Sequence, residues 1–163
     1  LKINHFRKNL LSFFKSKAKT TLLENVAKLS HIYTSKKINS IILLNYAPEV
    51  SDFLYWCQQL IAESLGKKGN GILPIISTMP KDNHSVMQNY LDGPKNNFFT
   101  FFYVKEKNPN KINKNTILSS YAYLSNKNLE QITLAQKKAT EKVFLLKNIP
   151  FRSFEIIDRD EES

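Results

Sequence analysis

The 163-residue sequence contains a single cysteine and only four glycines. Cys57 cannot form a disulfide within the chain, and no cysteine–histidine spacing suits a zinc site. A lone cysteine is typical of proteins from a reducing compartment. So few glycines, together with six prolines, exclude a collagen-like or linker-like chain. No apolar run approaches the roughly 18 residues that a membrane-spanning helix requires.

Acidic residues are scarce, since 24 Lys and Arg against 14 Asp and Glu give a net charge of +10. Such a balance fits either a solvated basic surface or an anionic partner such as a nucleic acid, a membrane surface or a phosphorylated metabolite. Residues 1–19 contain no acid, and their apolar residues alternate with bases. This pattern favours an amphipathic helix that packs on a neighbouring part of the protein over a targeting peptide, because no small-residue cleavage site follows. We therefore assign residues 1–20 to a basic amphipathic segment and 21–163 to one α/β domain.

Apolar residues make up 42% of the sequence, and their spacing predicts the secondary structure. Short, nearly continuous apolar runs predict strands buried on both faces, at 38–46, 72–78, 98–104 and 151–157. Segments with apolar spacing of three to four predict helices, at 22–33, 51–65, 82–91 and 129–147. Strands that alternate with helices indicate a three-layer α/β/α sandwich with a mainly parallel sheet. In such sheets, ligands bind beyond the carboxyl ends of the strands.

A glycine-rich loop directly follows the predicted helix 51–65. Gln59 and Glu63 are four residues apart and share one face at the end of this helix. Three of the four glycines come next, at positions 66, 69 and 71. Gly66 has an ordinary explanation as a helix C-terminal residue, but an acid in the last turn opposes the helix dipole. Glu63 is therefore either a helix-end residue or a functional carboxylate, and the loop lacks the GxxxxGK[ST] pattern of a Walker motif.

The sequence Asp82-Asn83-His84-Ser85 stands after the predicted strand 72–78. A histidine at this place can exchange a proton near neutral pH. Because Glu63 and His84 both lie beside loops of the predicted parallel sheet, we expect them at the same end of that sheet. The simpler interpretation is a capping sequence, with Asp82 as the helix N-cap and His84 on the surface. Trp56 and the aromatic run 98–102 are expected in the core, although exposed rings could serve as a stacking platform for nucleic acid.

These segments, read together, resemble glucose-6-phosphate isomerase. The resemblance rests on QLIAESLGK from Gln59, GNGILP from Gly69 and DNHS from Asp82, followed by YLDGP from Tyr90. It is closest to the second sugar-isomerase (SIS) domain of that family, and it extends more loosely over residues 22–157. Such a domain has the alternating α/β fold that the apolar pattern predicts.

The resemblance implies an aldose–ketose isomerisation of glucose 6-phosphate and fructose 6-phosphate, through a cis-enediol, in glycolysis and gluconeogenesis. By position, Glu63 matches the base that moves the proton between C1 and C2, His84 the histidine that opens the sugar ring, and Gln59 a substrate-contacting glutamine. The family implies a cytoplasmic homodimer, because this histidine reaches the partner subunit's active site. It implies no metal and no organic cofactor, and neither a membrane nor a nucleic acid as partner.

Several parts of the family's active site have no counterpart in this sequence. The first SIS domain, the arginine that stabilises the enediolate and the C-terminal catalytic lysine are all absent. A single lost oxyanion donor costs about 10²–10³ in rate, so we expect the chain alone to be nearly inactive and to be part of a longer enzyme. Two alternatives stay open, namely a non-catalytic sugar-phosphate-binding SIS module and a basic nucleic-acid-binding domain.

Overall fold

A computed structural model describes residues 3–105, 111–113, 115 and 118–157 of the chain. The sequence predicts a polar loop over residues 108–115, and half of these residues lie outside the described ranges, as do all the acidic residues after position 157. The helices are α1 (Ile3–Lys15), α2 (Lys17–Ser35), α3 (Ser51–Leu65), α4 (Met87–Asp92) and α5 (Leu129–Leu146). The strands are β1 (Ser40–Asn45), β2 (Leu73–Thr78), β3 (Asn97–Val104) and β4 (Phe151–Ile156). Short 3₁₀ turns cover Pro48–Val50, Lys81–Asn83 and Ser119–Leu124.

The four strands form one parallel sheet in the order β2-β1-β3-β4. Each predicted strand is present, with bounds that differ by at most two residues from the sequence prediction. The central strands β1 and β3 are buried along almost their whole length. A parallel sheet buried on both faces requires helices on both sides, so the predicted fold class is confirmed.

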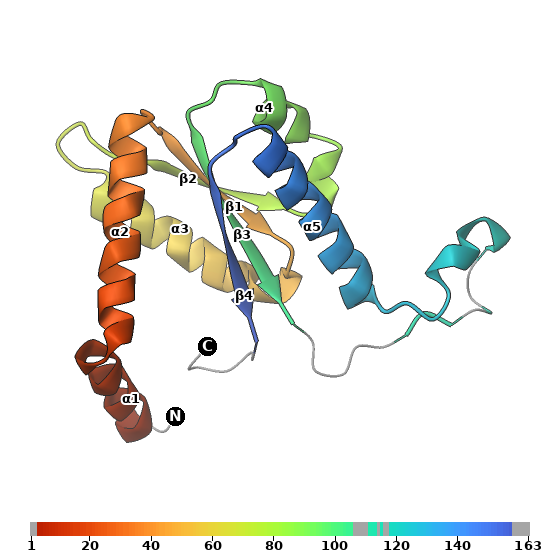
Figure 1. Ribbon diagram of the computed structural model, residues 1–163, viewed down its shortest axis with the longest axis horizontal. Coiled ribbons are helices and arrows are strands. Elements are labelled where there is room, and N and C mark those ends of the chain that lie inside the picture. Colours follow the sequence, from red (N-terminus) through yellow and green to blue (C-terminus); the bar gives the residue numbers. More distant parts are fainter. Residues whose placement is uncertain (1–2, 106–110, 114, 116–117, 158–163) are drawn as a thin grey trace.

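Helices α2 and α3 lie on one side of the sheet, and α4 and α5 lie on the other (Figure 1). A hydrophobic core separates each helix pair from the sheet. Alternate residues of β1 divide between the two cores, since Ile41 and Leu43 face α2 and α3 whereas Ile42 and Leu44 face α4 and α5. This alternation is the period-2 pattern of a strand. The result is a three-layer sandwich in which one helix pair covers each face.

Aromatic rings fill the core beneath α5. Phe144 is fully buried, and its ring contacts those of Phe99, Phe101 and Phe151 at centroid distances of 4.8, 5.5 and 6.0 Å. All three contacts are edge-to-face, which is a favourable geometry for aromatic pairs. Phe144 therefore anchors α5 to β3 and β4.

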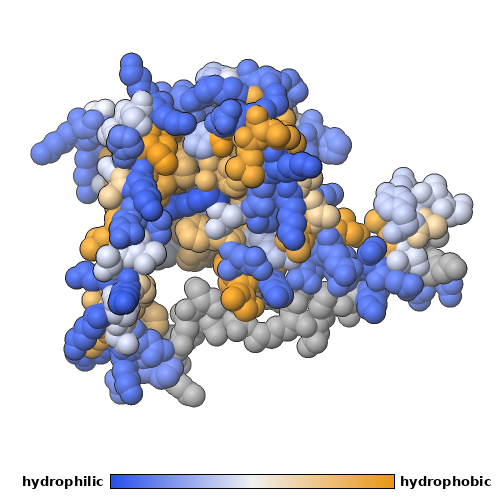
Figure 2. Space-filling view, in the orientation of Figure 1, coloured by the Kyte–Doolittle hydropathy of each residue, from blue (hydrophilic) through white to orange (hydrophobic). Residues whose placement is uncertain are grey.

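The prediction that Trp56 lies in the core is wrong. Its side chain is 57% exposed on α3, next to the exposed Phe53. Helix α3 has apolar residues on more sides than the sheet can cover. The side that packs against the sheet carries Leu54, Cys57 and Ile61. The orange patches between hydrophilic side chains in Figure 2 show that apolar residues also reach the surface elsewhere.

The N-terminal segment is helical, as the basic amphipathic pattern predicts. Helix α1 has no buried residue and contacts α2 rather than the sheet (Figure 1). What covers its apolar side stays a prediction, as does the domain boundary at residue 20. Among the helices that the structure describes, none has both the length and the hydropathy to cross a bilayer.

We expect Phe144→Ala to lower the free energy of unfolding by about 3–5 kcal/mol, because it opens a cavity in the aromatic core. Trp56→Ala is the matched control, and it should cost less than about 1 kcal/mol because the ring is mostly in water. Urea denaturation followed by circular dichroism measures both values. Equal costs for the two variants would contradict the assignment of core and surface.

Candidate functional site

Two glycines of the loop after α3 lie at positions where a side chain would collide with nearby backbone atoms. A Cβ at Gly66 would lie 2.6 Å from the carbonyl oxygen of Ala62, and a Cβ at Gly71 would lie 3.1 Å from Cα of Gly66. Gly71 also has a φ of +151°, which side chains rarely adopt. These glycines let the chain end α3 and fold back on itself before β2 begins.

Glu63 and Gln59 lie on the exposed side of the last turns of α3. The Gln59 amide Nε2 donates a hydrogen bond to Oε1 of Glu63 at 2.9 Å. In the described part of the chain, Glu63 forms no ion pair with Lys67 or Lys68. The carboxylate is thus oriented by an uncharged amide and is exposed to solvent.

His84 is also exposed, and it follows the 3₁₀ turn at 81–83. The prediction that Asp82 caps a helix beginning there is wrong, because α4 begins only at Met87 and has no side-chain cap. The Asp82 carboxylate points back to the end of β2 instead. It accepts hydrogen bonds from the Thr78 amide and the Ser77 hydroxyl, both at 2.8 Å.

Glu63 and His84 lie at opposite ends of the sheet, which corrects the expectation that they share one end. Helix α3 crosses from the carboxyl end of β1 to the amino end of β2, so its last turn is at the amino edge. The Gln58 side chain donates to the carbonyl of Pro74 at 2.9 Å, which joins α3 to the beginning of β2. His84 follows the carboxyl end of β2. The rise along helix and strand puts the two residues about 20 Å apart.

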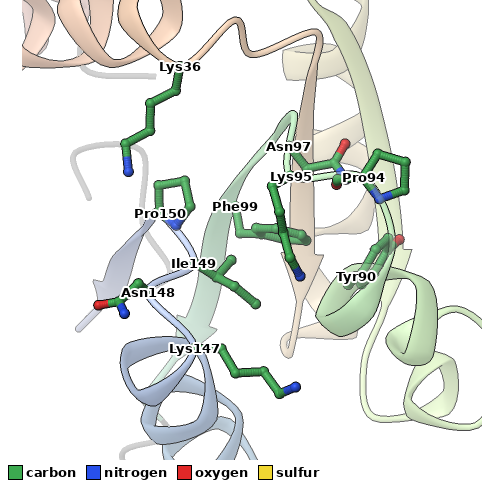
Figure 3. A pocket seen from close by; sticks show the side chains of 10 residues that line it. All are labelled: Lys36, Tyr90, Pro94, Lys95, Asn97, Phe99, Lys147, Asn148, Ile149 and Pro150. Atoms are coloured by element: carbon green, nitrogen blue, oxygen red, sulfur yellow. The ribbon is translucent and has the colours of Figure 1, made fainter.

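A cavity of about 330 Å³ opens at the amino ends of β3 and β4 (Figure 3). Its lining includes Lys36, Lys95 and Lys147, but none of the predicted site residues. Two of these lysines have structural partners, since Lys95 donates to the Leu91 carbonyl and Lys147 pairs with Asp92 at 2.8 Å. The Lys147 ammonium holds the pKa of the Asp92 carboxyl below its usual range. This cavity is therefore separate from the predicted site.

The sequence prediction missed an ion pair on α5 between a buried lysine and a partly buried glutamate. The Lys137 ammonium is buried, contacts Oε1 of Glu141 at 2.6 Å and lies 5.8 Å from the centre of the Phe101 ring. The Ser153 hydroxyl on β4 donates to the same carboxylate. A lysine and a glutamate four residues apart are common on helix surfaces, so the sequence carried no signal of their burial. Over the residues that the structure describes, no group of three or more His, Cys, Asp or Glu side chains could hold a metal.

The aromatic run on β3 is buried, as predicted. Phe98, Phe99, Phe101 and Phe102 are each at most 8% exposed. Stacking on bases requires exposed ring faces. These rings therefore provide no platform for nucleic acid.

Comparison with known proteins gives consistent matches over most of the chain. The chain is 36% identical to glucose-6-phosphate isomerase of Campylobacter jejuni over 131 residues. The aligned region covers 77% of this chain and 32% of that protein. The chain is also 38% identical over 139 residues to glucose-6-phosphate isomerase of Mycoplasmopsis pulmonis, covering 80% and 33%. A crystal structure of a hypothetical protein from Thermus thermophilus has the same fold, with a TM-score of 0.67 over 76% of this chain and 31% of that one, at 22% identity. No protein-family model matches the sequence.

The fold defines the class as a parallel α/β domain with helices on both faces of the sheet. Within that class, the chain is a partial homologue of the glucose-6-phosphate isomerase family. It spans about a third of the length of the curated relatives it matches.

We expect the Cys57 thiol to react more slowly with a disulfide reagent at pH 8 than the same thiol in the unfolded chain. Cys57 is half-buried where α3 packs on the sheet, and burial raises the pKa of its thiol. A raised pKa leaves less thiolate at a given pH, and the thiolate is the reactive form. Absorbance of the released thiolate measures the rate, with the chain in denaturant as the control. Equal rates in the two states would show that α3 does not dock as described.

Proposed function

We propose that this chain supplies the second SIS domain of a cytoplasmic glucose-6-phosphate isomerase, which interconverts glucose 6-phosphate and fructose 6-phosphate in glycolysis and gluconeogenesis. The observation that carries the proposal is the identity of 31–38% to proteins of that name over 77–80% of the chain. The parallel α/β fold agrees with it, because this is the fold expected of an SIS domain.

Glu63 is the proposed base. It takes the proton from C2 of the open-chain aldose to give the cis-enediolate, the O2 hydroxyl proton passes to O1, and the Glu63 carboxyl returns its proton to C1 to give the ketose. A carboxylate does this best in a water-poor cleft, where its basicity is raised. Gln59 supports this role because its amide orients the Glu63 carboxylate at 2.9 Å and lies on the same exposed helix face for contact with substrate.

The remaining part of the site is proposed to come from other polypeptide. Glu63 and His84 of one chain lie at opposite ends of the sheet, so they cannot act on one sugar phosphate. We assign His84 to ring opening in the site of a second copy, within a homodimer. The open surroundings of Glu63 would be closed by the segments that the longer relatives have and this chain does not.

The test is a chimera in which the matching third of the Campylobacter jejuni enzyme is replaced by this chain. We expect the chimera to isomerise fructose 6-phosphate and the chain alone to show almost no turnover. Glu63→Gln keeps the shape and the contact with Gln59 but removes the base, so kcat should fall by about 10²–10⁴-fold.

Glu24→Gln is the matched control, since Glu24 is an exposed carboxylate on α2. It should leave kcat unchanged. Near-normal turnover of Glu63→Gln in a folded chimera would show that Glu63 is an ordinary helix-end residue. A chimera that binds fructose 6-phosphate without turnover would favour the non-catalytic SIS module.

A further inference from the structure

His84 lies in a connection that has little regular structure of its own. Between the end of β2 and the start of α4 there is only the 3₁₀ turn Lys81–Asn83. A single turn fixes several backbone dihedrals for very few hydrogen bonds and is unstable in isolation. The place of the imidazole therefore depends on what holds this turn.

The Asp82 side chain holds the turn at three points. Its Oδ2 accepts from the Thr78 amide and from the Ser77 hydroxyl, both at 2.8 Å. Its Oδ1 accepts from the Ser85 hydroxyl at 3.2 Å. Hydrogen bonds to an ionised carboxylate are shorter and stronger than those between neutral groups. One carboxylate thus joins the last two residues of β2 to the residue that follows His84.

The attachment point of this carboxylate is rigid. Ser77 is 1% exposed and pairs with Leu44 of the central strand β1. The Ser77 hydroxyl donates to Oδ2 of Asp82, so the carboxylate is bound to a buried group of the sheet. Asp82 therefore ties the turn to the sheet.

The backbone around His84 is held by the same turn. The His84 amide donates to the Lys81 carbonyl at 3.2 Å, and the Val86 amide donates to the Asp82 carbonyl at 3.1 Å. The His84 side chain itself is exposed. A fixed backbone with an accessible imidazole is the arrangement that a proton-transfer residue requires.

We propose that Asp82 is a positioning residue, whose carboxylate fixes the turn 81–85 on β2 and so presents His84 for ring opening. This proposal rests on the proposed isomerase function. Asp82 acts through its bonds to Ser77, Thr78 and Ser85, and it does not touch the substrate.

The first test compares two substrates in the chimera described above. Asp82→Ala should lower turnover of ring-closed fructose 6-phosphate about 10–100-fold, as expected for a displaced catalytic group. It should have little effect on an open-chain sugar phosphate, which needs no ring opening. Asp82→Asn should restore most of the rate, because its amide oxygen can still accept from the Thr78 amide. Asp52→Ala, at an exposed acid in the first turn of α3, is the control.

A double-mutant cycle separates positioning from general destabilisation. If Asp82 acts only through His84, then Asp82→Ala should add almost nothing to the effect of His84→Ala. Additive losses, or equal losses on both substrates, would overturn the proposal because they indicate damage to the whole domain.

The second test does not use activity. Amide ¹⁵N relaxation of the chain alone should show loss of order at residues 81–86 in Asp82→Ala, and no change there in Asp52→Ala. Unchanged order in Asp82→Ala would overturn the proposal, whether or not the chimera is active. An inactive chimera with the unaltered sequence would count against the isomerase function alone, since the relaxation result still decides the role of Asp82.

Discussion

The burial of β1 and β3 on both faces is the constraint from which the rest of this structure follows. Apolar side chains point alternately to the two sides of each strand, and both sides must leave water. Helices α2 and α3 cover one face, and α4 and α5 cover the other. Parallel pairing then requires every connection to return the chain from the carboxyl edge to the amino edge.

This return of the chain separates the two residues that the sequence places in the site. A crossover helix ends at the amino edge, and Glu63 belongs to the last turn of such a helix. The next strand carries the chain back, so His84 follows at the carboxyl edge. The glycines that close the loop after α3 and the Asp82 carboxylate that holds the next turn stabilise these two ends independently. In the proposed homodimer, each copy of this domain would therefore contribute Glu63 to one site and His84 to the other.

The apolar runs were sufficient to predict the sheet, because short runs rich in aromatic residues, such as FFTFFYV on β3, are typical of a strand buried on both sides. The position of Trp56 could not be predicted, since α3 is apolar on several sides and only packing decides which side meets the sheet. The role of Asp82 was missed for a related reason. An aspartate at a turn can bond forward to a helix or backward to a strand, and local sequence does not distinguish the two. The resemblance singled out Glu63 and His84 as candidate site residues, but their proximity along the sequence did not show that they lie at opposite ends of the sheet.

The distance between residues 63 and 84 decides whether one copy of the domain can hold both residues in a single site. Spin labels at Glu63→Cys and His84→Cys, in a chain that carries Cys57→Ser, allow it to be measured by double electron–electron resonance. The length of β2 and of the last turns of α3 predicts a single distribution centred at about 20–30 Å, including the label arms. A distance well below this range in the monomeric chain would put both residues at one end of the sheet and would contradict the account.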